Sequence, residues 1–174
     1  MADHSYVPVS GREVPRFAGV KTFFRLPYVA LHADYDVGIV GVPFDGGASY
    51  RPGQRFAPTR VREVTSLGRV FHMGRMSSFI EKVKVADVGD VPVVPINLDM
   101  TYQRIQEFFA KGLALKKRFI SVGGDHSVTL PILREVRKAV GRPVRVIHFD
   151  AHLDTYPAAW DCEYHLGSCA RHAV

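Results

Sequence analysis

Two carboxylates and an imidazole alternate at the end of an apolar run. Asp150, His152 and Asp154 occupy every second position of the stretch VIHFDAHLDTY, residues 146–156. An extended backbone turns alternate side chains to the same side, so all three can point to one place. Carboxylates brought together without a partner are costly to bury, and a cation removes that cost. Mixed oxygen and imidazole ligation suits Mn²⁺, with Ni²⁺, Co²⁺ or Zn²⁺ as competitors. The alternative is a loop with solvated acids and one core histidine.

A second histidine follows another apolar run, in the stretch GGDHSVTLP of residues 123–131. The two glycines permit a tight turn, and His126 then comes just before a helix that we expect to begin at Ser127. Asp125 or Ser127 could cap this helix through its first amides, and we accept that role for Ser127. His126 is assigned to the same metal site as Asp150, because both follow strands that are expected to end at one edge of a sheet.

The elements that must position these residues alternate between strand and helix. The alternation predicts an α/β fold, a three-layer α/β/α arrangement around a mostly parallel sheet. Asp99 is expected to cap the second helix, and Gly141 to end the third. We expect a terminal arm over residues 1–35 and one α/β domain over residues 36–174. The predicted strands lie within residues 35–44, 82–91, 118–124 and 145–149, and the predicted helices within 58–68, 97–117 and 127–141.

The bulk composition fits one domain with a full core, since 174 residues are too few for two large ones. The net charge of +6 comes from scattered Lys and Arg on expected helix faces, so we predict no nucleic-acid binding. No apolar run is long enough to span a bilayer. Two cysteines form no disulfide framework, and the N-terminus lacks an apolar leader, so a cytoplasmic location is expected.

At this point the sequence resembles the ureohydrolase family, which includes arginases, agmatinases and related guanidino-acid hydrolases. GGDHSVTLP and HFDAHLDTY look like its metal-binding segments, and GVPFDGGASYRPGQRFAPTRVRE is similar to the agmatinase branch. The resemblance runs from about Arg16 to the C-terminus. It implies an arginase-like fold and hydrolysis of a small cationic guanidino substrate, agmatine-like, to urea and an amine. It also implies a homo-oligomer, a trimer or hexamer.

The resemblance implies a role for each matching residue. His126 and Asp154 would ligate a first divalent metal, His152 a second, and Asp150 would bridge both. A hydroxide shared by the two metals, Mn²⁺ or else Ni²⁺ or Co²⁺, would attack the guanidinium carbon. Asp125 would support this ligand set from outside it. The residues that bind the rest of the substrate are not indicated.

Two departures from the family pattern bear on activity. The family has a later Asp-x-Asp segment with further ligands, and this chain ends at Val174 before it, so we expect a fold incomplete at its C-terminus. The family also has His-Gly-Thr or His-Gly-Ser where this chain reads His165-Leu166-Gly167-Ser168. His165, one residue early, is the candidate for proton transfer, with an ordinary surface histidine as the alternative. Guanidinobutyrase or guanidine hydrolase activity, a non-catalytic assembly or regulatory subunit, and a nucleotide-binding domain are the rival hypotheses.

Overall fold

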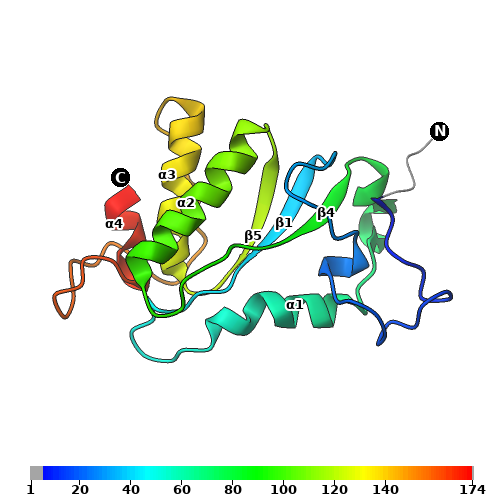
Figure 1. Ribbon diagram of the computed structural model, residues 1–174, viewed down its shortest axis with the longest axis horizontal. Helices are drawn as coiled ribbons and strands as arrows, with labels where there is room; N and C mark the ends of the chain where they lie inside the picture. Colours follow the sequence, from blue (N-terminus) through cyan, green and yellow to red (C-terminus); the bar gives the residue numbers. More distant parts are fainter. Residues whose placement is uncertain (1–5, 174) are drawn as a thin grey trace.

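The structure, a computed structural model, describes residues 6–173. Three parallel strands form its main sheet among these residues, in the order β4–β1–β5 (Figure 1). They are β1 at Val37–Val42, β4 at Val85–Asp90 and β5 at Arg118–Gly123. In the parallel register, Val37 of β1 pairs with Val85 on one side and with Arg118 on the other. All the carboxyl ends therefore lie at one edge of the sheet.

Helices cover both faces of this sheet (Figure 1). One face packs on α1, Ala57–Thr65, and the other on α2, Leu98–Ala114, beside which lies α3, Thr129–Val140. The alternation of β1 explains this division, because Ile39 faces Val61 of α1 whereas Val40 joins Ile105 and Phe109 of α2 in the main core. The predicted α/β/α layering is confirmed.

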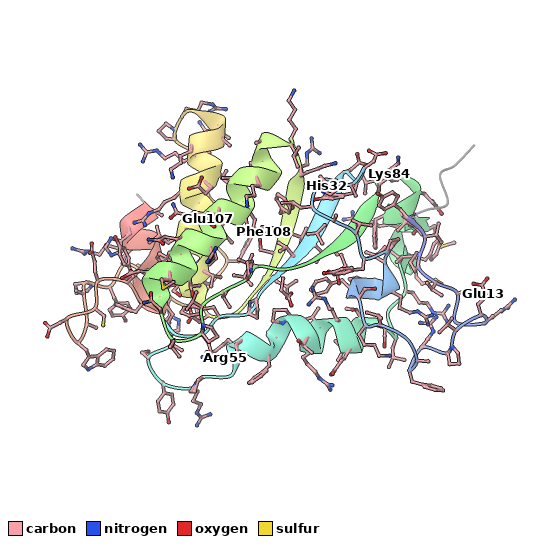
Figure 2. All side chains as sticks on the ribbon, viewed as in Figure 1. Glu13, His32, Arg55, Lys84, Glu107 and Phe108 are labelled. Atoms are coloured by element: carbon pink, nitrogen blue, oxygen red, sulfur yellow. The ribbon has the colours of Figure 1, made fainter. Side chains whose placement is uncertain are left out.

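Aromatic packing joins α2 to β5. Phe108, labelled in Figure 2, lies 5.6 Å from Phe109 and 6.1 Å from Phe119 between ring centroids. The fully buried Phe109 contacts Phe119 edge-on at 5.2 Å. Such pairs add to the area that they bury. They hold the helix over the strand that leads to His126.

The end of α3 agrees with the sequence prediction, whereas the start of α2 differs from it. Gly141 ends α3 with a φ of 71°, a left-handed conformation that suits glycine. The cap of α2 is Asn97, whose side chain accepts a hydrogen bond from the Met100 amide at 2.8 Å. The prediction that Asp99 caps this helix is therefore wrong. Asp99 lies in the first turn, where its charge still suits the helix dipole.

The remaining elements are short. The C-terminal helix α4 covers Cys169–Ala173, and a small antiparallel pair joins β2, Phe71–His72, to β3, Ser77–Ser78. Single 3₁₀ turns lie at Phe23–Arg25, Gln54–Phe56, Met73–Arg75, Phe79–Glu81, His126–Val128 and Leu166–Ser168. Within residues 6–173, no helix has the length and apolar character needed to cross a membrane.

The strand predicted over residues 145–149 does not form, and that prediction is wrong for the described structure. Residues 143–150 are irregular backbone, with Ile147 82% and Phe149 95% exposed. Among the described residues β5 pairs only with β1, and its Ile120 is also exposed. Strand propensity reports how well a side chain fits a packed surface, and here no second surface covers the run.

A buried ion pair fixes α1 at the carboxyl end of β4. The Arg62 guanidinium binds both carboxylate oxygens of Asp87, at 2.7 and 2.9 Å, and the Asp90 carboxylate at 2.8 Å. Asp87 also accepts the backbone N–H of Phe23 at 3.1 Å. The same cluster thus joins the N-terminal segment to the sheet. Residues 1–5 of the predicted arm lie outside the described residues.

Candidate metal centre

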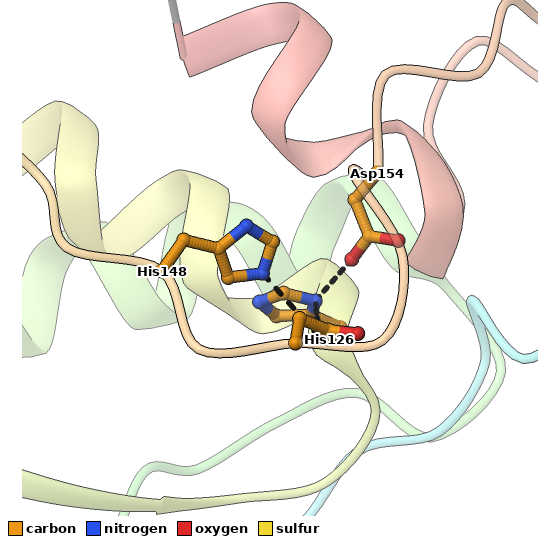
Figure 3. A group of neighbouring side chains, drawn as sticks. His126, His148 and Asp154 are labelled. Carbon is orange, nitrogen blue, oxygen red and sulfur yellow. Dashed lines mark hydrogen bonds and ion pairs between the residues drawn. The ribbon is translucent and has the colours of Figure 1, made fainter.

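Four side chains converge beyond the carboxyl end of β5. They are His126, His148, Asp150 and Asp154, and one ligand atom from each lies within 4.8 Å of all the others. The segment that contains the last three loops around His126, so that His148 approaches from one side and Asp154 from the other (Figure 3). Three of the four are predicted metal ligands. His148 is the addition.

Asp125 sets the position of His126. Its carboxylate accepts the backbone N–H groups of Gly47 at 2.8 Å and Ser127 at 2.7 Å, and it is almost fully buried. Burial raises the pKa of this carboxyl, although the hydrogen bonds from Ser127 and Gly47 oppose the rise. A Cβ on Gly47 would lie 2.6 Å from the Ser127 Oγ, so this approach requires glycine. Asp125 therefore ties the loop after β1 to the turn that presents His126.

Backbone hydrogen bonds from the start of α4 hold Asp154 in position. Its carbonyl accepts the backbone N–H groups of Ala170 at 3.0 Å and Arg171 at 3.2 Å. Its φ is 52°, a conformation that is uncommon for a residue other than glycine. Its buried carboxylate contacts the Nδ1 atom of His126. These bonds hold a strained residue with its carboxylate at the cluster.

Asp150 presents its two oxygens to different histidines. Its Oδ2 lies 3.5 Å from His126 Nδ1 and 3.3 Å from His148 Nε2. Its Oδ1 lies 3.6 Å from His152 Nδ1 and accepts the His152 backbone N–H at 2.9 Å. The pKa of Asp150 is lowered, first by this backbone hydrogen bond and also by His148 and His126. A carboxylate divided in this way can bridge two cations.

His152 lies outside the group of four. Its side chain is 71% exposed, and its Nδ1 lies 3.6 Å from the Oδ1 oxygen of Asp150. His148 was missed by the sequence reasoning, although a signal was present. It continues the alternation of Asp150, His152 and Asp154 by one more step backward. His148 lies inside the strand predicted for residues 145–149.

His165 lies in a separate cavity of about 460 Å³. Its Nδ1 accepts the Gly167 N–H at 3.3 Å, and its Nε2 lies 3.0 Å from the Pro157 carbonyl. The next residue, Leu166, donates its N–H to the Gly47 carbonyl at 2.9 Å, which connects this cavity to the loop that Asp125 holds. The cavity is lined by Gly46, Gly47, Ala48, Ser49, Leu98, Asp99 and residues 159–165.

Neighbouring side chains have structural surroundings. Tyr164 packs against Tyr102 at 5.6 Å between ring centroids and lies under the Arg134 guanidinium. Cys169 is buried 3.8 Å from the Asp154 carboxylate, and burial followed by that charge raises its pKa to about 12. A thiol with such a pKa is protonated at neutral pH, and a protonated thiol is a poor nucleophile.

The donor set of the cluster fits a divalent transition metal. Two imidazoles and two carboxylates are the ligands that Mn²⁺, Co²⁺, Ni²⁺ and Zn²⁺ share. The Nδ1 atom of His126 faces carboxylate oxygens of both Asp150 and Asp154, and one N–H cannot satisfy both well. One cation could be held by one ligand atom from each of the four side chains.

A sequence model of the arginase family matches residues 35–174. The chain belongs to the arginase family. The arginase-family relatives include guanidinopropionase of Pseudomonas aeruginosa, 43% identical over 169 residues, which cover 96% of this chain and 52% of the relative. The solved structure of proclavaminate amidinohydrolase from Streptomyces clavuligerus has a TM-score of 0.83 at 39% identity, and the match covers 91% of this chain and 52% of that one.

A further arginase-fold structure, Trypanosoma cruzi formiminoglutamase, is described with Mn²⁺. It has a TM-score of 0.70 at 26% identity and covers 79% of this chain and 46% of that chain. This chain spans about half the length of the relatives that it matches.

Proposed function

We propose that this chain provides the metal centre of a hydrolase that cleaves a linear guanidino compound to urea and an amine. The observation that best supports the proposal is the position of Asp150, with one carboxylate oxygen towards His126 and the other towards His152. His126 and Asp154 would hold a first divalent cation, His152 a second, and Asp150 both. Mn²⁺ is preferred, and Ni²⁺ or Co²⁺ are the alternatives.

When bound, such a cation pair lowers the pKa of water towards neutrality and so provides a nucleophile. The chain's own residues determine where that nucleophile lies. The backbone hydrogen bonds to the Asp154 carbonyl and to the Asp125 carboxylate hold Asp154 and the turn before His126 in place. His165 is the residue proposed to move a proton to the departing amine, which requires its Nε2 to leave the Pro157 carbonyl.

The cavity that contains His165 supports a cationic substrate. Three carboxylate side chains line it, those of Asp99, Asp161 and Glu163, together with the exposed ring of Trp160. Acidic and aromatic surfaces attract ammonium and guanidinium groups and disfavour a free carboxylate. We therefore propose an agmatine-like substrate, whose second end is an amine, in preference to 3-guanidinopropionate or 4-guanidinobutyrate.

A second candidate role is that of an assembly subunit. It is favoured by the exposed apolar side chains of Ile120 in β5 and of Ile147 and Phe149. Exposed apolar groups of this size commonly mark an interface. A trimer or hexamer, like a cytoplasmic location, stays a prediction, and light scattering of the purified chain tests the assembly.

Urea release in the presence of Mn²⁺ tests the hydrolase proposal. Agmatine, 3-guanidinopropionate and 4-guanidinobutyrate are offered in parallel to the wild type and to two carboxylate-to-amide variants. Asp154→Asn removes a proposed ligand, whereas Glu107→Gln changes an exposed residue on α2 (Figure 2). We expect urea from the wild type and from Glu107→Gln, with agmatine preferred, and none from Asp154→Asn. Urea from Asp154→Asn at the wild-type rate would refute the proposed centre. If the wild type and both variants are present in equal amounts and none of them releases urea, the assembly role is favoured.

A further inference from the structure

His148 has a position at the metal centre that the family resemblance does not assign to it. Its Nε2 atom lies 3.3 Å from Asp150 Oδ2, the same oxygen that faces His126. The His148 and His126 rings lie 5.1 Å apart between centroids (Figure 3). The side chain of His148 is only partly exposed. Two imidazoles therefore approach one carboxylate oxygen.

Apolar surroundings favour a fixed position for this imidazole. His126 and His148 line a cavity of about 310 Å³ together with Leu133, Val144 and Val146. A polar nitrogen that lies against apolar side chains gains most from a hydrogen-bond or metal partner on the side that they leave uncovered. The open side of His148 is the point at which His126, Asp150 and Asp154 meet.

Ordinary hydrogen bonding does not account for the cluster as well as a cation does. Asp154 and Asp150 both present oxygens to His126 Nδ1, and His148 presents a second nitrogen to Asp150. Two protonated imidazoles would neutralise the carboxylates but would bring two positive rings together. One divalent cation neutralises both carboxylates and accepts a lone pair from each neutral imidazole.

We propose that His148 is a metal ligand of this chain, so that the two proposed cations are held unequally. One cation has four protein ligands in His126, His148, Asp150 and Asp154. The second has two within residues 6–173, the Oδ1 oxygen of Asp150 and His152. The first site therefore fills first and retains its ion when excess metal is removed. This inference rests on the proposed function only through the shared use of His126, Asp150 and Asp154.

The chain contains a matched pair of histidines for the test. His148 and His152 lie two residues before and two residues after Asp150. Mn²⁺ is titrated into the wild type, His148→Ala and His152→Ala, and free Mn²⁺ is followed by electron paramagnetic resonance. At one bound ion per chain, the couplings of ¹⁴N nuclei to Mn²⁺ report how many imidazoles coordinate it. Thermal unfolding without metal shows that each variant is folded, and His148→Gln replaces His148→Ala if the latter is not.

We expect one tight site in the wild type, with two coupled imidazoles, and a second, weaker site. His148→Ala should lower the tight affinity by more than about 100-fold, beyond the range for residues that only orient ligands. It should also leave one coupled imidazole, and added free imidazole should restore part of the affinity. His152→Ala should keep the tight site and both couplings and lose the weak site.

Unchanged affinity and two couplings in His148→Ala would overturn the inference. A loss of the tight site in His152→Ala would overturn it as well, and would leave the proposed hydrolase centre standing. If the wild type binds no Mn²⁺, both this inference and the metal-dependent function of this chain are refuted. Urea release is not needed for any of these outcomes.

Discussion

Replacing Arg62 by alanine should strongly destabilise the fold. Arg62 is 10% exposed, and Asp87, which it binds through two hydrogen bonds, is fully buried. Removing one partner of a buried ion pair leaves an uncompensated charge and costs about 3–5 kcal/mol. Two backbone amides, those of Phe23 and Gly89, still bind the Asp87 carboxylate. They favour the lower half of that range.

Other contacts of Arg62 move the value upward again. Its guanidinium lies over the Phe23 ring at 4.2 Å from the centroid, and a desolvated contact of this kind contributes up to about 2 kcal/mol. The bond to Asp90 adds little, because that side chain is 39% exposed. We therefore expect a loss of about 4 kcal/mol in the free energy of unfolding. With an m-value of about 2 kcal/mol/M, the midpoint of urea unfolding falls by about 2 M.

Arg60→Ala is the matched control on the same helix. Arg60 is exposed and forms an i,i+3 ion pair with the exposed Glu63 at 2.9 Å, worth at most about 0.5 kcal/mol. Urea unfolding followed by circular dichroism measures both variants, and Arg62→Lys, which keeps the charge, is measured if Arg62→Ala does not fold. A loss for Arg62→Ala within about 1 kcal/mol of that for Arg60→Ala would refute the reasoning.

Three further predictions follow from the buried groups near the sheet edge. Asp125→Asn should lower the free energy of unfolding by about 1–3 kcal/mol and weaken Mn²⁺ binding by about 10–100-fold, because it changes the hydrogen-bond acceptor that holds the turn before His126. Unfolding and metal titrations measure the two effects, and an unchanged metal affinity would contradict this role of Asp125. The pKa of Asp45 is lowered, since the hydrogen bonds from Arg55 and backbone amides outweigh burial. Its contribution to stability is therefore present above the unfolded pKa of about 3.9 and is lost as pH falls through the lower folded value, so Asp45→Asn should flatten the acid limb of stability against pH; an equally steep limb in the variant would count against it. The pKa of Cys169 is raised to about 12, so a thiol reagent at pH 8 should modify the exposed Cys162 and leave Cys169 unmodified, as mass spectrometry of the labelled chain will show; rapid labelling of Cys169 in the folded chain would refute its burial.

The layers of the fold could be predicted from local patterns because those patterns report burial. The β-branched run around Val40 is buried on both faces, and the periodic residues Ile105 and Phe109 face it from α2. Residues 145–149 have the same apolar character but form no strand. Their sequence favours a strand that packs against a surface, whereas the structure within residues 6–173 provides no such surface for them.

The metal centre was predictable in part for a similar reason. Alternation and the family resemblance together pointed to His126, Asp150 and Asp154, which the structure brings together. His148 follows the same alternation, but it lies in an expected strand, where an imidazole would be taken as part of the core. The site roles of these residues, and that of His165, stay predictions until metal binding and activity are measured.

Long-range partners were the least accessible to sequence reasoning. Asp87 and Asp90 both bind Arg62, more than twenty residues earlier in the chain. No local pattern specifies that pair, because it depends on how α1 packs against the end of β4. The choice of Asn97 over Asp99 as the cap of α2 likewise depends on where the backbone turns.

Metal stoichiometry tests the central claim most directly. The purified chain and its Asp154→Asn variant are incubated with Mn²⁺, freed of excess metal, and analysed for manganese by elemental analysis. The proposed centre predicts about one tightly retained ion per wild-type chain, a second only in the presence of excess Mn²⁺, and close to none in Asp154→Asn. Wild-type protein that retains no manganese, or a variant that retains as much as the wild type, would contradict the claim that these residues form a metal centre.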